Sequence, residues 1–170
     1  MARISLIEEE NAEASAKRIM ENLRKQFGVV IDPVKALAHK PDFLRSLLSL
    51  TTVADGPGGI DLGFKEVLNI RASVLNGCEF CTQMHSRMAG MHKVPPEKVE
   101  GAREGSSSAA FDGKEKAALA LCEESTRDVK VSDATFDAVK AHYSEPEIVE
   151  LMGAISVINM WNRLMVAFGF

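Results

Sequence analysis

Apolar side chains recur every three or four positions along most of the chain, which is the period of an α-helix with one buried face. No segment alternates convincingly between polar and apolar residues, so the pattern predicts an all-α helical bundle. Proline, glycine and capping residues set the expected boundaries. We expect helices over 8–26, 34–39 (a single turn), 41–53, from an N-cap at Asp61 to about Leu75, 78–91, a short helix from Pro95, and then 113–126, 133–142 and 145–168.

Two of these starts carry a capping-box pattern, in which a side chain at the N-cap and a glutamate three residues later bond each other's backbone. The pairs are Asp112 with Glu115 and Ser144 with Glu147. The run Gly105–Ser108 is predicted to be a flexible linker. At 170 residues the chain has the length of one domain, so we interpret 1–170 as a single domain with a helical tail over 112–170.

Composition narrows the class of protein. Hydrophobic residues make up 46% and charged residues 26%, which is ordinary for a globular protein, and the net charge of −4 argues against nucleic-acid binding. The N-terminus has no signal-like apolar segment, and three cysteines do not form a disulfide framework, so we expect a cytoplasmic protein. Leu151–Phe170 has the length of a membrane span, but Asn159, Asn162 and Arg163 interrupt it, so we expect no membrane insertion.

The candidate chemistry lies at the start of the fifth expected helix. Cys78, Cys81 and His85 are spaced i, i+3 and i+7, which places them on one helix face. The positive end of the helix favours the thiolate over the thiol, and a histidine one turn further on is in reach to accept the thiol proton. On the preceding helix Glu66, Asn69 and Ser73 form a polar line. A tight turn at Asn76–Gly77 folds that line back toward the cysteines, so that we expect Glu66 to orient His85 or to share its proton through a water.

This spacing resembles the alkylhydroperoxidase D-like (AhpD-like) branch of the carboxymuconolactone decarboxylase family, whose pattern is Glu, eleven residues, Cys-x-x-Cys, three residues, His. It stands here without gaps as Glu66, Cys78, Cys81 and His85. The core of the resemblance covers about residues 40–104. The tail is also similar to the longer members, through 117–121 and 159–163.

The resemblance implies an all-helical homo-oligomer, a trimer or hexamer, without a cofactor. It also implies a thiol-dependent peroxidase in which Glu66 and His85 activate Cys81 and Cys78 forms the disulfide. The substrate is then a hydroperoxide, and the reductant is a dithiol of lipoyl or thioredoxin type. In relatives of this branch a further histidine precedes the second cysteine, whereas this chain has Phe80 there.

Other interpretations of the same residues stay open. Cys78 and Cys81 are also compatible with simple core packing, or with a zinc site completed by His85 and Glu66. A redox-sensing oligomer would oxidise the pair without turnover. A lactone enzyme of the decarboxylase type would use Glu66 and His85 alone. Cys122, in an alanine- and leucine-rich helix, is predicted to be core, and Arg163 is predicted to pair with an acid.

Overall fold

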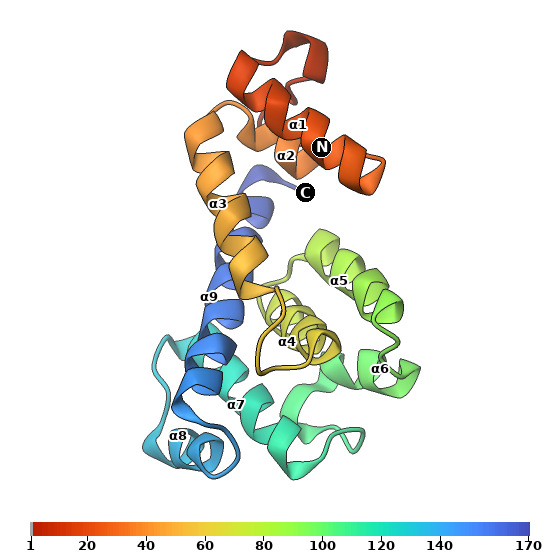
Figure 1. Ribbon diagram of the computed structural model, residues 1–170. Coiled ribbons are helices and arrows are strands. Elements are labelled where there is room, and N and C mark those ends of the chain that lie inside the picture. Colours follow the sequence, from red (N-terminus) through yellow and green to blue (C-terminus); the bar gives the residue numbers. More distant parts are fainter. Residues whose placement is uncertain (1) are drawn as a thin grey trace.

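The computed structural model describes residues 2–170, and within them it contains helices and connecting loops but no strand (Figure 1). The all-α prediction is confirmed. The α-helices are α1 (Ala14–Phe27), α2 (Asp32–Leu37), α3 (Pro41–Ala54), α4 (Leu62–Leu75), α5 (Glu79–Met91), α6 (Pro96–Glu104), α7 (Gly113–Asp128), α8 (Asp133–Lys140) and α9 (Glu145–Phe168). Two short 3-10 turns, Glu9–Asn11 and Gly105–Ser107, complete the set.

Helix α4 is the centre of the larger part of the molecule. It packs against α5, α6, α7 and α9, and most of its side chains from Gly63 to Ser73 are buried. The apolar core around it includes Leu68, Ile70, Leu119, Leu151 and Ile155. A helix surrounded in this way must bury its polar side chains as well, which requires each of them to have a partner. That requirement shapes the functional site.

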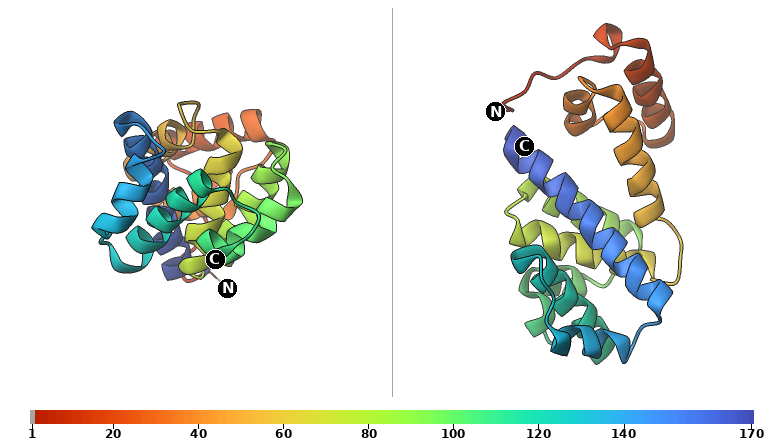
Figure 2. Two further views of the ribbon diagram at one scale, coloured as in Figure 1. Left: turned by 90° about the horizontal axis from the view of Figure 1, so that it is seen from below. Right: turned by 90° about the vertical axis from the view of Figure 1, so that its left-hand side faces the viewer.

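A second, smaller apolar cluster joins α1, α2 and α3, with Met20, Val34 and Leu44 among its members. Helix α9 connects the two parts, since Trp161, Leu164 and Phe168 contact both clusters. Helices α3 and α9 pack side by side and run in opposite directions (Figures 1 and 2). The two ends of the chain meet at the C-terminal end of α9, where the Arg3 backbone N–H donates to the Phe168 carbonyl at 2.7 Å.

Most predicted boundaries lie within two residues of the observed ones, and both capping pairs form. The Asp112 carboxylate accepts from the Glu115 N–H at 2.8 Å, and the Glu115 carboxylate accepts from the Asp112 N–H at 3.1 Å. The Glu147 carboxylate accepts from the Ser144 N–H at 2.7 Å. These bonds satisfy donors that have no partner inside the helix.

Two predictions about the chain's organisation are wrong. The first helix does not begin at 8: a 3-10 turn at Glu9–Asn11 precedes α1, and the turn lets Glu9 pair with Arg24 at 2.9 Å. Gly105–Ser108 is not a flexible linker either, because the Glu123 carboxylate accepts from both the N–H (2.9 Å) and the hydroxyl (2.7 Å) of Ser106. Both segments are polar, and in both the polar groups have found fixed partners.

Helix α9 is long and apolar enough to cross a membrane by length and composition alone. In the fold it packs against α3, α4, α5, α7 and α8. Asn162, in the C-terminal half of the helix, is completely buried and donates to the Ser73 hydroxyl at 3.0 Å. Arg163 does not pair with an acid of the described chain; it is exposed and donates to the Asn159 carbonyl at 2.9 Å. The trimeric or hexameric state stays a prediction.

Candidate active site

Cys78 and Cys81 lie at the N-terminus of α5, where the structure joins them in a disulfide. Cys78 is the N-cap residue, and its sulfur accepts from the Cys81 N–H at 3.4 Å. Both side chains are buried, Cys78 completely and Cys81 to within 2%. When the pair is reduced, the N–H groups of the first helical turn and the positive end of the helix are arranged to stabilise a thiolate here.

Glu66 and His85 form a hydrogen-bonded pair behind the cysteines. The Nδ1 atom of His85 lies 2.6 Å from a carboxylate oxygen of Glu66, and both side chains are buried. Because a carboxylate accepts, Nδ1 carries the proton and Nε2 is the ring nitrogen that can accept one. The pairing follows from the helix spacing: Glu66 lies on α4, His85 lies on α5, and these two helices pack against each other.

The turn between α4 and α5 sets the register of this pair. Gly77 has φ of +67°, a conformation that strains residues with a Cβ. The Asn76 side chain donates to the side-chain oxygens of Asn159 (2.9 Å) and Asn162 (3.0 Å) on α9. The turn is thus tied to the opposite helix, and the first residue after it is Cys78.

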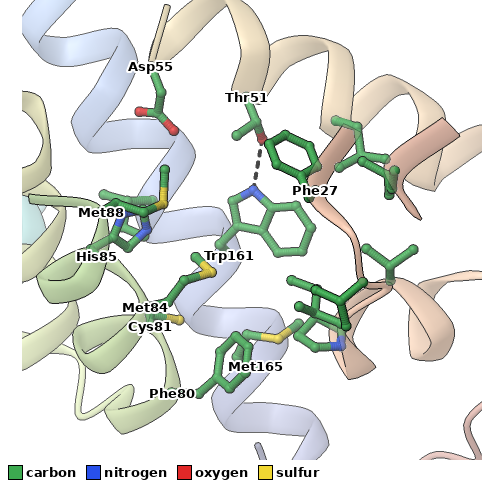
Figure 3. Close-up of a pocket in the computed structure, with 17 residues that line it drawn as sticks. Phe27, Thr51, Asp55, Phe80, Cys81, Met84, His85, Met88, Trp161 and Met165 are labelled. Atoms are coloured by element: carbon green, nitrogen blue, oxygen red, sulfur yellow. Dashed lines mark hydrogen bonds between the residues drawn. The ribbon is translucent and has the colours of Figure 1, made fainter. Parts of the chain in front are cut away.

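An apolar cavity of about 330 Å³ lies between α5 and the cluster of α1, α2 and α3 (Figure 3). Cys81 and His85 lie along its α5 wall, while Cys78 and Glu66 are not among the lining residues. Most of the wall is apolar: Leu23, Phe27, Val29, Ile31, Pro33, Val34, Leu48, Phe80, Met84, Met88, Ile158, Trp161 and Met165. Trp161 is fixed by a bond of 2.8 Å from its indole N–H to the Thr51 hydroxyl. A small or slender apolar molecule is therefore the kind of ligand that this cavity fits.

Phe80, which lies between the two cysteines in the sequence, lines this cavity. Phe80 is part of the wall and also packs against Phe170, with ring centroids 6.4 Å apart. No titratable group therefore stands at the position where relatives of the AhpD-like branch are expected to carry a further histidine.

Sequence analysis missed one polar residue of the cavity, Asp55, because Asp55–Gly59 has the composition of an ordinary loop. Asp55 follows α3 as its C-cap and lines the same cavity as Cys81 and His85. Its carboxylate accepts from the Asn69 side chain at 3.2 Å. The polar line of Glu66, Asn69 and Ser73 on α4 was the available signal, since a buried Asn69 needs a partner and Asp55 is that partner.

The third cysteine lies in the core, apart from the other two. Cys122 is completely buried, as predicted, and burial raises the pKa of its thiol to about 12. Among residues 2–170 no group of three or more His, Cys, Asp or Glu side chains is arranged to hold a metal ion. In the described structure Cys78 and Cys81 are joined to each other instead.

The model of the carboxymuconolactone decarboxylase family matches residues 41–124. YdfG of Bacillus subtilis (strain 168), an uncharacterized protein, is 34% identical over 107 residues, covering 62% of this chain and 73% of its own. The chain belongs to the carboxymuconolactone decarboxylase family, and within it to the AhpD-like members.

Solved structures share the fold. An uncharacterized peroxidase-related protein of Ralstonia eutropha JMP134, with an alkylhydroperoxidase AhpD core, superposes with a TM-score of 0.88 at 18% identity, covering 99% of this chain and 90% of its own. A putative antioxidant defence protein AhpD of Agrobacterium tumefaciens gives 0.73 at 27% identity, over 78% and 91%. The debrominase Bmp8 gives 0.84 at 21% identity, over 98% and 89%. The fold is thus shared with a protein described as peroxidase-related and with a debrominase.

Proposed function

We propose that this protein is a thiol-dependent peroxidase that reduces organic hydroperoxides through Cys78 and Cys81. The observation that carries the proposal is the buried contact of 2.6 Å between Glu66 and His85 beside a cavity that Cys81 lines. A carboxylate, an imidazole and a thiol in this order are the parts of an activated nucleophile. Two simple core cysteines would not need a buried acid–base pair next to them.

The chemistry begins with the reduced pair. His85 takes the proton of Cys81 at Nε2, while Glu66 stabilises the imidazolium that forms. The Cys81 thiolate attacks the terminal oxygen of the hydroperoxide, the O–O bond breaks, and Cys81 becomes a sulfenic acid. The alkoxide that leaves takes up a proton and becomes the alcohol. Cys78 then displaces water from that sulfenic acid to give the disulfide. Cys81 is the attacking residue in this order because it lines the cavity and Cys78 does not.

A dithiol must then reduce the disulfide, and the burial of both sulfurs favours a slender donor. Cys78 is completely buried and Cys81 is reached through the cavity. A lipoyl-type dithiol on a flexible arm can enter an apolar cavity of about 330 Å³. A thioredoxin-type protein presents its cysteines on a broad surface and has no such access. We therefore favour the lipoyl-type partner.

Steady-state loss of cumene hydroperoxide with dihydrolipoamide as the donor tests the proposal. We expect turnover by the wild type, none by Cys81→Ser, and a loss of about 100-fold for Glu66→Gln, because general base catalysis contributes about that much or more. Cys122→Ala is the matched control, since that thiol lies away from the cavity, and it should turn over like the wild type.

Two results would overturn the proposal. Turnover that survives in Cys81→Ser would exclude the thiol mechanism. A wild type that is oxidised once and then stops, with every donor supplied in excess, would favour the redox-sensing interpretation instead. The lactone interpretation predicts activity on a carboxylated lactone that survives replacement of both Cys78 and Cys81.

A further inference from the structure

The cavity has a carboxyl group that the proposed mechanism does not yet use. Asp55 lies at the α3 end of the cavity, with its carboxyl end turned to the side on which His85 and Met88 lie (Figure 3). The surrounding wall is mostly apolar, so this carboxyl group has few polar neighbours along the cavity. A carboxyl placed in such surroundings is unfavourable unless it has a task or several partners.

Two buried side chains of α4 hold Asp55 in place. Lys65 is almost completely buried and donates to the carbonyls on either side of Asp55, those of Ala54 (3.0 Å) and Gly56 (2.5 Å). Its charge is balanced by Glu150 at 2.7 Å. Asn69, completely buried, donates to the Asp55 carboxylate from its Nδ2, while its Oδ1 has no partner in the described chain. Burying a lysine and an amide oxygen without a partner is costly, and the two side chains that carry these groups both bond Asp55 or its immediate neighbours.

The charges near Asp55 come from α4 and α5. Burial raises the pKa of its carboxyl, and the charge of Glu66 acts in the same direction. The hydrogen bond from Asn69 and the charges of His85 and Lys65 oppose that rise without cancelling it. The site thus contains two acidic groups in different environments, one bonded to His85 and one facing the apolar cavity. Such a pair divides the roles of base and acid between its members.

We propose that Asp55 is the general acid of the peroxidase reaction and gives its proton to the alkoxide that leaves when the O–O bond breaks. The inference rests on the proposed function. In this step the Cys81 thiolate supplies the electron pair of the new S–O bond, and the pair of the O–O bond leaves with the alkoxide. The proton on Asp55, passed directly or through one water, makes it an alcohol. The proton that His85 took from Cys81 then returns through solvent to Asp55, so protons balance.

The choice of peroxide tests this role. An alkyl hydroperoxide releases an alkoxide, a strong base that needs a proton, whereas peracetic acid releases acetate, which does not. We therefore compare Asp55→Asn with the wild type in single-turnover oxidation of the reduced protein, followed by counting the remaining thiols. The variant should oxidise about 100-fold more slowly with cumene hydroperoxide, the loss expected for a missing general acid, and at nearly the wild-type rate with peracetic acid.

Controls separate this role from damage to the site. Asp42→Asn changes an exposed carboxyl at the other end of α3 and should behave as the wild type with both oxidants. Alkylation of Cys81 by iodoacetamide should be unchanged in Asp55→Asn, because thiolate formation depends on His85 and Glu66. Equal losses with both peroxides would overturn the assignment of Asp55. A wild type that reacts with neither peroxide would instead overturn the proposed function.

Discussion

The two faces of α4 carry two kinds of cysteine environment. Toward α5, the buried side chains of Glu66 and Asn69 are polar, and each bonds a residue that lines the cavity of Cys81. Toward α7, Leu68 and Leu119 belong to the apolar core, and the Cys122 thiol donates a weak bond to the Leu68 carbonyl at 3.7 Å. Both cysteine sites are buried, so burial alone does not separate them.

The difference lies in what a thiolate would meet in each place. At Cys81 a helix N-terminus and a histidine with an acid partner stabilise the charged states that the reaction needs. At Cys122 desolvation is the largest effect on the thiol and keeps it protonated. The reactivity of a cysteine therefore depends on the charged and polar groups next to it. The apolar face of α4 toward α7, where Cys122 lies, contributes to the stability of the fold instead.

The largest expected effect is on alkylation of the reduced protein. With a pKa of about 12, Cys122 has about 1000-fold less thiolate at neutral pH than an ordinary cysteine, and it is also inaccessible. Iodoacetamide should therefore label Cys81 at least about 1000-fold faster than Cys122. Peptide mass mapping at timed intervals measures both rates. Labelling of Cys122 at a rate similar to that of Cys81 in the folded protein would contradict the proposed difference between the two thiol environments.

A substitution on the apolar face should change stability and leave the reactivity of Cys81 unchanged. Leu68→Ala removes a completely buried side chain and should lower the free energy of unfolding by about 3 kcal/mol. Leu50→Ala, at a half-exposed position of α3, is the control and should change it by less than about 0.5 kcal/mol. Urea unfolding followed by circular dichroism measures both. A Leu68→Ala variant as stable as the control would contradict the assignment of this face.

The smallest expected effect is on how the free energy of unfolding depends on pH. Burial raises the pKa of Asp55 in the folded state above its ordinary value of 3.8, so the folded protein binds that proton more tightly than the unfolded chain. The stability that this group contributes is therefore complete below 3.8 and is lost as the pH rises through the folded-state pKa. Asp55→Asn should consequently be more stable than the wild type at neutral pH, and the difference should shrink on acidification.

Unfolding curves of both proteins across this pH range test the sign. A variant less stable than the wild type at neutral pH would mean that the carboxylate is well compensated by Lys65 and Asn69. A gain in stability on removing Asp55 would mean that this carboxyl is kept at the expense of the fold, as expected for a group with a catalytic task.

The local pattern of the sequence was enough to predict the helices and the proximity of Glu66, Cys78, Cys81 and His85. Helix period, prolines and capping pairs depend on neighbours a few positions away, and for that reason the predicted bounds of α4, α5, α7 and α9 agree with the structure. The spacing of Glu66 and His85 across one tight turn is also a local quantity. The prediction of a flexible linker at Gly105–Ser108 was wrong, because Glu123, which holds this segment, lies on a different helix.

The sequence by itself therefore determined the all-α class, the helix that carries Cys78 and Cys81, and the acid–base pair next to it. Only the tertiary structure decided which cysteine faces a cavity, what that cavity is made of, and that Asp55 belongs to it. The wall brings together α1, α2, α3, α5 and α9, which are far apart in the chain. The helix period of the sequence does not predict this contact, because it is fixed by the packing of helices that are distant in the chain. Only the folded chain shows that Asp55 lines the cavity.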